Sequence, residues 1–239
     1  MQPLPQSINP RYKPSDKLHG KVALVTGGDS GIGRVCIRGC TVAFTYVKGI
    51  EDKDDTLQML GKVKANDANY PIAIAADIRF EENCKRVVDQ VVNEFGQIDS
   101  LINNAAEEHY TESIEEITEA VLKTLFRTNI FSLFFFTSEG AILSFTRSLA
   151  LQLIKQGIRV NAVAPFPTCT PQQPASLPAD MVAHLGCEAP MGRAGQPYEI
   201  SPAFVFLASR EGSCGSSSCL NTTVKLGVTG SNGQGMTSL

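Results

Sequence analysis

Short runs of apolar and often β-branched residues alternate along this chain with segments in which apolar residues recur at helical spacing. The runs predict five strands, at residues 22–26, 41–47, 72–76, 101–104 and 158–164. The segments between them predict helices, most clearly at residues 82–95 and 118–126. Strands that are apolar on both faces and alternate with helices form parallel sheets that helices cover on both sides. The pattern therefore predicts an α/β fold with a doubly wound parallel sheet.

The same pattern divides the chain into three parts. Residues 1–19 contain four prolines and few apolar residues, which predicts an extended N-terminal arm that lies on the surface or is disordered. Residues 20–209 hold all the predicted strands and form one domain. Residues 210–239 are rich in Gly and Ser and poor in large apolar side chains, so we expect a loose C-terminal tail.

The composition narrows the class of partner. Of the 239 residues, 21 are Lys or Arg and 24 are Asp or Glu, so the formal net charge is only -3. This charge provides no field that could hold nucleic acid or an anionic membrane, and a small molecule is the expected partner. The densest apolar stretch, residues 130–136, is too short to span a bilayer, so no membrane insertion is expected. Seven cysteines without a secretory signal predict reduced thiols and a cytoplasmic protein.

The strongest local signal is a glycine-rich turn directly after the first predicted strand. Gly27, Gly31 and Gly33 follow Thr26. Glycines at this spacing allow a tight turn and a close approach to a pyrophosphate, whose charge the N-terminus of the next helix stabilises. The turn therefore predicts a loop that binds a dinucleotide, NAD or NADP.

The spacing resembles the TGxxxGxG loop of the short-chain dehydrogenase/reductase family, and four further features follow in the family's order. They are Asp77-Ile78, residues 103–106, Asn129 and residues 158–165. The amino-acid sequences of several segments are similar to those of plant glucose and ribitol dehydrogenase homologues. The resemblance implies a Rossmann-type fold and hydride transfer between a nicotinamide dinucleotide and a small sugar or polyol. It also implies a homo-oligomer that pairs through helices near residues 118–126 and 140–156.

The resemblance also assigns the cofactor contacts residue by residue. The residues so assigned are Gly27, Ser30, Gly31, Ile32, Gly33, Lys48, Asp77, Ile78, Asn104, Ala105 and Thr170. The second strand ends without an acidic residue for the ribose 2′-hydroxyl, and Arg34 and Lys48 could pair with a 2′-phosphate, which favours NADP. The alternative, that both are solvated surface cations, stays open. Phe166 stands at a glycine position of the family, which predicts a poorer approach of the backbone to the nicotinamide.

The catalytic positions depart from the family, which uses a Ser on the fifth strand and a Tyr-x-x-x-Lys pair. Phe135 and Glu139 occupy the Tyr and Lys positions. Only five residues separate Asn129 from Phe135, so the fifth strand and its Ser are missing. A phenylalanine has no proton to give, and a glutamate cannot lower the pKa of a neighbouring tyrosine. Asn129, the family's relay asparagine, is the remnant of a site that we expect to be inactive.

Other side chains do not replace the missing ones. The nearby candidates Tyr110, Ser132, Ser138 and His109 lack the Tyr-x-x-x-Lys spacing, and no metal site is expected. Cys36 and Cys40 are expected to be packing residues.

Three readings stay open. They are an active reductase, a non-catalytic protein that binds a dinucleotide or another subunit, and a poorly folded product of a damaged reading frame. The last reading rests on the expected damage to the fold. Without the fifth strand, its neighbours stay unpaired or meet directly. The helices on either side of the gap could fuse near Gly140, and the helix of the first crossover is expected to lack one to two turns.

Overall fold

The computed structural model describes residues 4–8, 16–36, 39–64, 68–111, 113–131, 139–212 and 219–221. At its centre lies a parallel sheet of four strands in the order β3-β2-β1-β4. The strands are β1 (Val22–Val25), β2 (Thr41–Tyr46), β3 (Ile72–Ala75) and β4 (Ser100–Ile102). A separate parallel pair is formed by β5 (Ala162–Ala164) and β6 (Cys219–Asn221). The predicted α/β fold with a doubly wound parallel sheet is confirmed.

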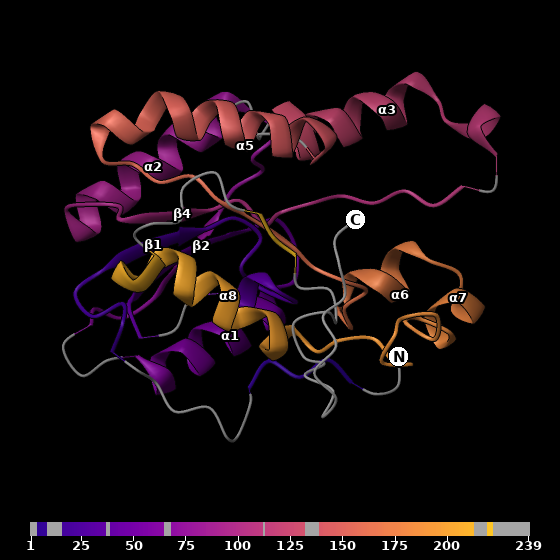
Figure 1. Ribbon diagram of the computed structural model, residues 1–239, viewed down its shortest axis with the longest axis horizontal. Helices are drawn as coiled ribbons and strands as arrows, with labels where there is room; N and C mark the ends of the chain where they lie inside the picture. The colour runs from indigo at the N-terminus through magenta and orange to yellow at the C-terminus, as the bar shows by residue number, and fades with distance from the viewer. Residues whose placement is uncertain are drawn as a thin grey trace, which may run out of the picture.

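Helices lie on both sides of the four-stranded sheet (Figure 1). One side carries α1 (Ile50–Val63) and α8 (Pro197–Ala208), and the other carries α2 (Glu81–Phe95), α3 (Glu119–Phe126) and α5 (Glu139–Leu153). The short helices α6 (Gln172–Ser176) and α7 (Ala179–Ala183) lie at one end of the molecule. Single turns complete the chain: the 3-10 turns η1 (Gly33–Val35), η2 (Ile114–Glu116), η4 (Ile154–Gln156) and η5 (Arg210–Gly212), and the π turn η3 (Arg127–Phe131).

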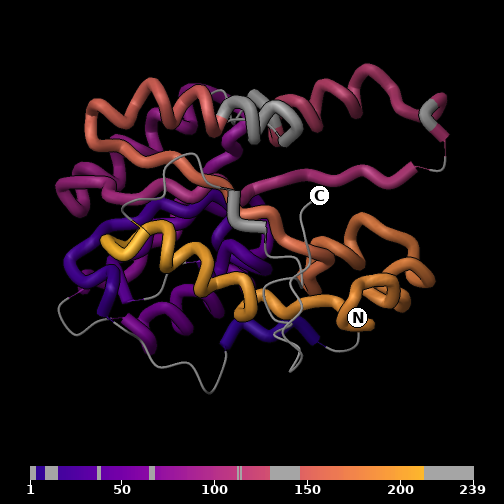
Figure 2. Tube along the Cα trace, viewed as in Figure 1, coloured from indigo at the N-terminus to yellow at the C-terminus, as the bar shows by residue number. Residues whose placement is uncertain are grey.

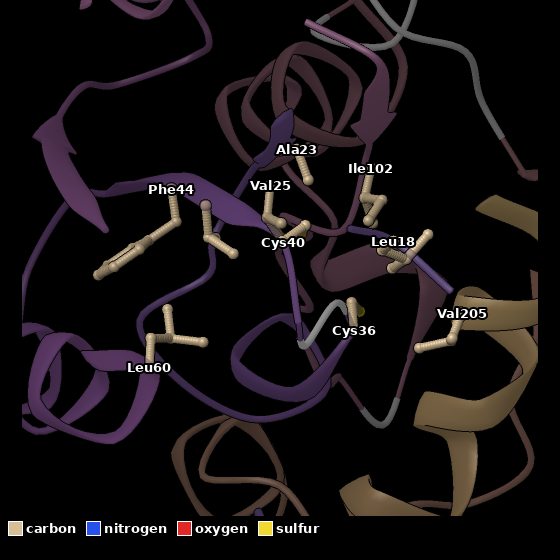
Figure 3. Packing of buried hydrophobic residues seen from close by; sticks show 10 residues of the cluster. Leu18, Ala23, Val25, Cys36, Cys40, Phe44, Leu60, Ile102 and Val205 are labelled. Carbon is tan, nitrogen blue, oxygen red and sulfur yellow. The ribbon is translucent and has the colours of Figure 1, made fainter. Parts of the chain in front are cut away.

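The core consists of two apolar clusters, one on each face of the sheet, because successive strand side chains point to opposite faces. The first cluster joins β1 and β2 to α1 and α8 (Figure 3). Its buried members are Leu18, Ala23, Val25, Cys36, Cys40, Val42, Phe44, Leu60, Ile102 and Val205. The second cluster lies under α2 and contains Val22, Leu24, Ala43, Ile74, Ala76, Val87 and Val91. Both clusters belong mainly to residues 18–102.

Two strands differ from their predicted bounds by more than one residue. The strand predicted at 101–104 is β4, which ends at Ile102 because the backbone N–H of Asn104 turns away to donate to Thr26 Oγ1 at 3.0 Å. The strand predicted at 158–164 shortens to β5 at Ala162–Ala164, where the backbone finds a partner in β6. Hydrogen-bond pairing, rather than apolar content, therefore sets where β4 ends and where β5 begins.

Both ends of the chain contact the domain where the structure describes them. The backbone N–H of Gln6 donates to Gln196 Oε1 at 2.8 Å, and Leu18 is buried in the first cluster. In the tail that the sequence predicts to be loose, Cys219–Asn221 pair with β5 as strand β6. The division at residues 19 and 209 stays a prediction.

The connections around the sheet agree with a shortened chain. Where the first crossover is described, its helix is the single turn η1, and the sequence predicts a helix shortened by one to two turns. In Figure 2, α3 and α5 follow each other along one side of the molecule. Their junction, residues 132–138, lies outside the described residues, so the fusion of the two helices stays a prediction.

Candidate functional site

The glycine-rich turn leaves β1 in a conformation that requires glycine. Gly27 and Gly31 have φ angles of +58° and +53°, in the left-handed region. A Cβ atom on Gly33 would overlap the carbonyl oxygen of Gly27 and the side-chain amide of Asn104. The turn continues into η1, where the backbone N–H of Arg34 donates to Ser30 O at 3.1 Å. The glycine spacing therefore has the structural cause that the sequence predicted.

Asn104 and Ala105 fix this loop to the end of β4. The side-chain amide of Asn104 donates to the carbonyl oxygens of Thr26, at 3.1 Å, and Gly27, at 2.8 Å. The backbone N–H groups of Asn104 and Ala105 both donate to Thr26 Oγ1, at 3.0 and 3.1 Å. The structure thus brings together the predicted cofactor contacts of the first and fourth strands.

The other side of the loop is braced through the carbonyl oxygen of Asp29. It accepts hydrogen bonds from Arg34 Nε at 2.9 Å and Nη2 at 2.6 Å, and from the hydroxyl of Thr56 at 2.6 Å. Arg34 Nη2 also lies 3.3 Å from Asp52 Oδ1. Burial, with a smaller contribution from the charge of Asp52, raises the pKa of the Asp29 carboxyl. Arg34 therefore supports the loop, whereas Lys48 is exposed beyond the end of β2.

Asp77, expected at the adenine, is held by its neighbour in the chain. Arg79 Nε donates to Asp77 Oδ1 at 2.9 Å, and Arg79 Nη2 donates to Oδ2 at 2.6 Å. These bonds lower the pKa of the Asp77 carboxyl. Ile78 is buried beside it. An adenine that bonds to this carboxylate must share it with Arg79, a partner that the sequence analysis missed although it stands two residues away.

Thr170, expected at the nicotinamide, is buried and lies against the glycine loop. A Cβ atom on Gly31 would lie 3.3 Å from Cβ and Cγ2 of Thr170. The segment before Thr170 is fixed by Gly195, whose N–H donates to Pro167 O at 2.9 Å and whose carbonyl accepts from Cys169 N at 2.8 Å. The loop and the segment after β5 thus meet at Gly31 and Thr170.

Phe166 does not point freely into this site, because its ring packs against Gly195. A Cβ atom on Gly195 would overlap the ring carbon Cζ of Phe166. The sequence analysis considered Phe166 alone and missed its glycine partner, for which the sequence carries no signal other than the glycine itself.

Asn129 lies in the π turn η3, and π turns inside helices are frequent at functional sites. Its side-chain Nδ2 donates to Glu107 O at 2.7 Å, and its Oδ1 accepts from Glu107 N at 2.8 Å. Thr128 Oγ1 also donates to Glu107 Oε2 at 2.9 Å. Asn129 therefore anchors the segment after β4 to the turn through both of its amide atoms.

The structure describes only part of the remaining candidates. Phe135, Ser132 and Ser138 lie outside the described residues, and Glu139 is the first residue of α5. The described residues contain no group of His, Cys, Asp and Glu suited to a metal ion. Cys36 and Cys40 are buried, as predicted for packing residues, and burial raises the pKa of the Cys40 thiol to about 12.

Family models match the chain in two consecutive parts. A model described as short chain dehydrogenase matches residues 21–140, and one described as Enoyl-(Acyl carrier protein) reductase matches residues 137–221. The two matches meet at residues 137–140, directly after the position at which the sequence predicts the missing strand.

Curated relatives match nearly the whole chain. A glucose and ribitol dehydrogenase of Daucus carota is 52% identical over 89% of this chain and 87% of its own. The NADPH-dependent aldehyde reductase 1, chloroplastic, of Arabidopsis thaliana is 52% identical over 87% of this chain and 86% of its own. The region matched to the carrot protein spans 253 residues, more than the 239 of this chain, so the relative contains residues that have no counterpart here.

Solved structures agree with these matches. A dehydrogenase/reductase from Sinorhizobium meliloti is 25% identical with a TM-score of 0.76, covering 87% of this chain and 95% of that one. A short chain dehydrogenase from Burkholderia cenocepacia in complex with NADP, at 24% identity, has the same fold, with a TM-score of 0.74 over 86% of this chain and 97% of that one. The extent of the family matches and the 52% identity to the carrot protein establish that this chain belongs to the short-chain dehydrogenase/reductase family, whose members are NAD(P)-dependent oxidoreductases.

Proposed function

We propose that this protein binds NAD or NADP at the loop from Gly27 to Gly33 but does not catalyse hydride transfer. The observation that carries the proposal is the contrast between a complete, anchored cofactor loop and the replaced catalytic positions. Gly33 lies where any side chain would overlap Gly27 and Asn104. Close packing at the third glycine is typical of loops whose backbone groups hold a pyrophosphate, which supports binding here. A bound nicotinamide supplies or accepts a hydride, and the reaction also needs a proton donor.

The residues that would move the proton are absent from the sequence positions of the family. Phe135 has no ionisable proton, and Glu139 introduces a carboxylate where the family has a cation. Asn129 remains, but both of its amide atoms bond to the backbone of Glu107. A sugar or polyol, the substrate class in the name of the carrot relative, would therefore be bound without being oxidised.

NADP is the favoured cofactor in this proposal. Lys48 is exposed beyond the end of β2, where an acidic residue would otherwise bond the ribose 2′-hydroxyl. The Arabidopsis relative is named an NADPH-dependent reductase, which supports the same preference. Arg34 contributes less than the sequence suggested, because its guanidinium bonds to Asp29 O and Asp52. The substitution Lys48→Glu should weaken binding of NADPH by about tenfold and change binding of NADH little.

We also propose that the protein is a cytoplasmic homo-oligomer. Buried free thiols at Cys36, Cys40 and Cys84 support a reducing compartment, although the name of one Arabidopsis relative places that protein in the chloroplast. None of the helices in the described ranges is long and apolar enough to cross a membrane. Apolar side chains exposed on α3 and α5, among them Leu122, Phe126 and Leu151, support association between subunits.

The test is a titration of the purified protein with NADPH and NADH, followed by cofactor fluorescence and by the melting temperature. Binding should raise the melting temperature, because the ligand binds only the native state. Gly31→Ala should weaken binding at least ~tenfold, because the new Cβ meets both a left-handed backbone and Thr170.

The matched control is Gly96→Ala. Gly96 also has a positive φ, +80°, but nothing lies within 4 Å of its added Cβ, and it ends α2 away from the loop. This variant should lose stability and keep its affinity. A cooperative melt that millimolar NADPH and NADH leave unchanged would refute the proposal.

A further inference from the structure

The outer edge of β4 offers an unused backbone pairing site. Ile102 O accepts from Thr26 N at 3.0 Å, so the backbone groups of Ile102 face β1. Because these groups alternate sides along a strand, the N–H and C=O of Leu101 face away from β1. In the described ranges neither group has a hydrogen-bond partner, and the Leu101 side chain is 44% exposed.

A cavity adjoins the amino end of this edge. It has a volume of about 530 Å³ and is lined by Ser100 of β4, by Arg159 three residues before β5, and by Ser209 after α8. A water molecule takes up about 30 Å³ of liquid, so the cavity has room for several residues of extended chain. Arg159 fixes one wall, because its guanidinium donates to Leu207 O and Gly212 O, each at 2.7 Å. The ends of β4 and β5 therefore border one space.

The chain itself lacks a segment that would fill this space. The carrot relative contains residues without a counterpart here, and the two family matches meet at residues 137–140. In the described part of the chain, β4 pairs only with β1, and β5 pairs only with β6. The first residue of β4, Ser100, and Arg159, which precedes β5, line the same cavity, so a strand that enters from the cavity would run in the same direction as β4 and β5.

We propose that the edge of β4 that is unpaired among the described residues, together with the adjoining cavity, binds one extended segment of a separate polypeptide as a parallel strand. Strand addition of this kind takes its affinity from backbone hydrogen bonds, here to the N–H and C=O of Leu101. The amino end of the segment lies in the cavity. Four cationic and three acidic side chains line that cavity, with His19 counted as neutral, so an acidic residue at the start of the segment balances the charge.

The probe is a synthetic peptide with the sequence of the carrot protein in the segment that this chain lacks. Binding to the full-length protein is measured by fluorescence anisotropy of the labelled peptide, and separately by the melting temperature. The wild-type protein should bind the peptide saturably and melt at a higher temperature with it. The same peptide with proline at alternate positions should not bind, because it cannot donate to the edge.

Two variants at one position separate backbone pairing from side-chain contact. Leu101→Pro removes only an N–H that faces outward, which an edge strand tolerates, and should weaken the peptide at least ~tenfold. Leu101→Ala keeps the N–H and should change the affinity by less than about threefold. Circular dichroism checks that both variants fold. Absence of saturable binding to the wild-type protein, or equal binding to both variants, overturns the proposal; neither result bears on dinucleotide binding.

Discussion

Two groups of helices differ in how completely they cover the sheet: α1, α2 and α8 lie over buried apolar clusters, whereas α3 and α5 leave large apolar side chains exposed. Under α1, α2 and α8, the strands contribute to two closed apolar clusters, and Leu24 on β1 is 1% exposed. On α3 no described residue is buried, and Leu122 is 46% exposed. In α5, Leu151 is 73% exposed. The well-packed part uses contacts among residues 18–102 and α8. The loss of a later strand, which the sequence predicts, would therefore leave this part intact and remove support only from the layer above β4.

The largest effect expected from this division concerns turnover. Reduction of simple carbonyls with NADPH should lie at least ~10²-fold to 10⁴-fold below that of the carrot relative, because the proposed function leaves the site without a general acid. The double variant Phe135→Tyr with Glu139→Lys should stay at background, because on this proposal the Ser of the fifth strand is still missing. The decrease in NADPH absorbance measures the turnover of the wild-type protein and of the double variant. Recovery of activity in the double variant would show that the catalytic layer is intact.

A matched pair of leucine substitutions compares the well-packed part of the molecule with the layer formed by α3 and α5. Leu24→Ala should destabilise the fold by about 2–5 kcal/mol, because it opens a cavity in a buried cluster. Leu151→Ala on α5 should stay within about 0.5 kcal/mol, because the side chain already faces solvent. Urea unfolding of both variants measures the two losses in the free energy of unfolding. Equal losses would mean that α5 is covered in solution, for example by another subunit.

Association between subunits should follow from the exposed layer formed by α3 and α5. Exposed apolar side chains on α3 and α5 favour a dimer or larger species at micromolar concentration, and so does the edge of β4, which has no partner strand in the described part of the chain. Light scattering measures the mass. Insertion of the missing carrot segment between Asn129 and Phe135 should sharpen the thermal transition. A monodisperse monomer that melts sharply above ~60 °C would contradict this prediction.

A smaller effect concerns the pH dependence of the well-packed part. Burial raises the pKa of the Asp29 carboxyl above its ordinary value of 3.8, so the native state holds this proton more tightly than the unfolded chain does. This group therefore lowers stability as the pH rises through the raised native pKa. Asp29→Asn should remove that decline and strengthen pyrophosphate binding. Melting temperatures between about pH 4 and pH 7 test it, with the exposed Asp55→Asn on α1 as the control.

The sequence predicted the parts of the fold that depend on local pattern. The strands β1, β2 and β3 and the helices α2 and α3 lie within one or two residues of their predicted ranges, because each combines an apolar pattern with clear boundaries. Gly96, for example, ends α2 with a φ of +80°. Strand β6 was missed, because its pairing with β5 depends on residues distant in the sequence.

The same limit applies to the site. The glycine loop and its contacts with Asn104 and Ala105 follow a fixed spacing, and the structure brings them together. The use of Arg34 as a brace was not predictable, because the position of the Asp29 carbonyl depends on the fold of the loop. The clamp between Asn129 and Glu107 was missed for a similar reason, since Glu107 contributes only backbone atoms to it.

The contact between Phe166 and Gly195 has a consequence for the evolution of this chain. The ring occupies the volume that any side chain at position 195 would need. A return to glycine at position 166 would empty that volume, whereas a larger residue at position 195 would first require the ring to leave. Either substitution is costly while the other residue stays, so the two positions must change together, and each restricts the sequences that its partner can explore.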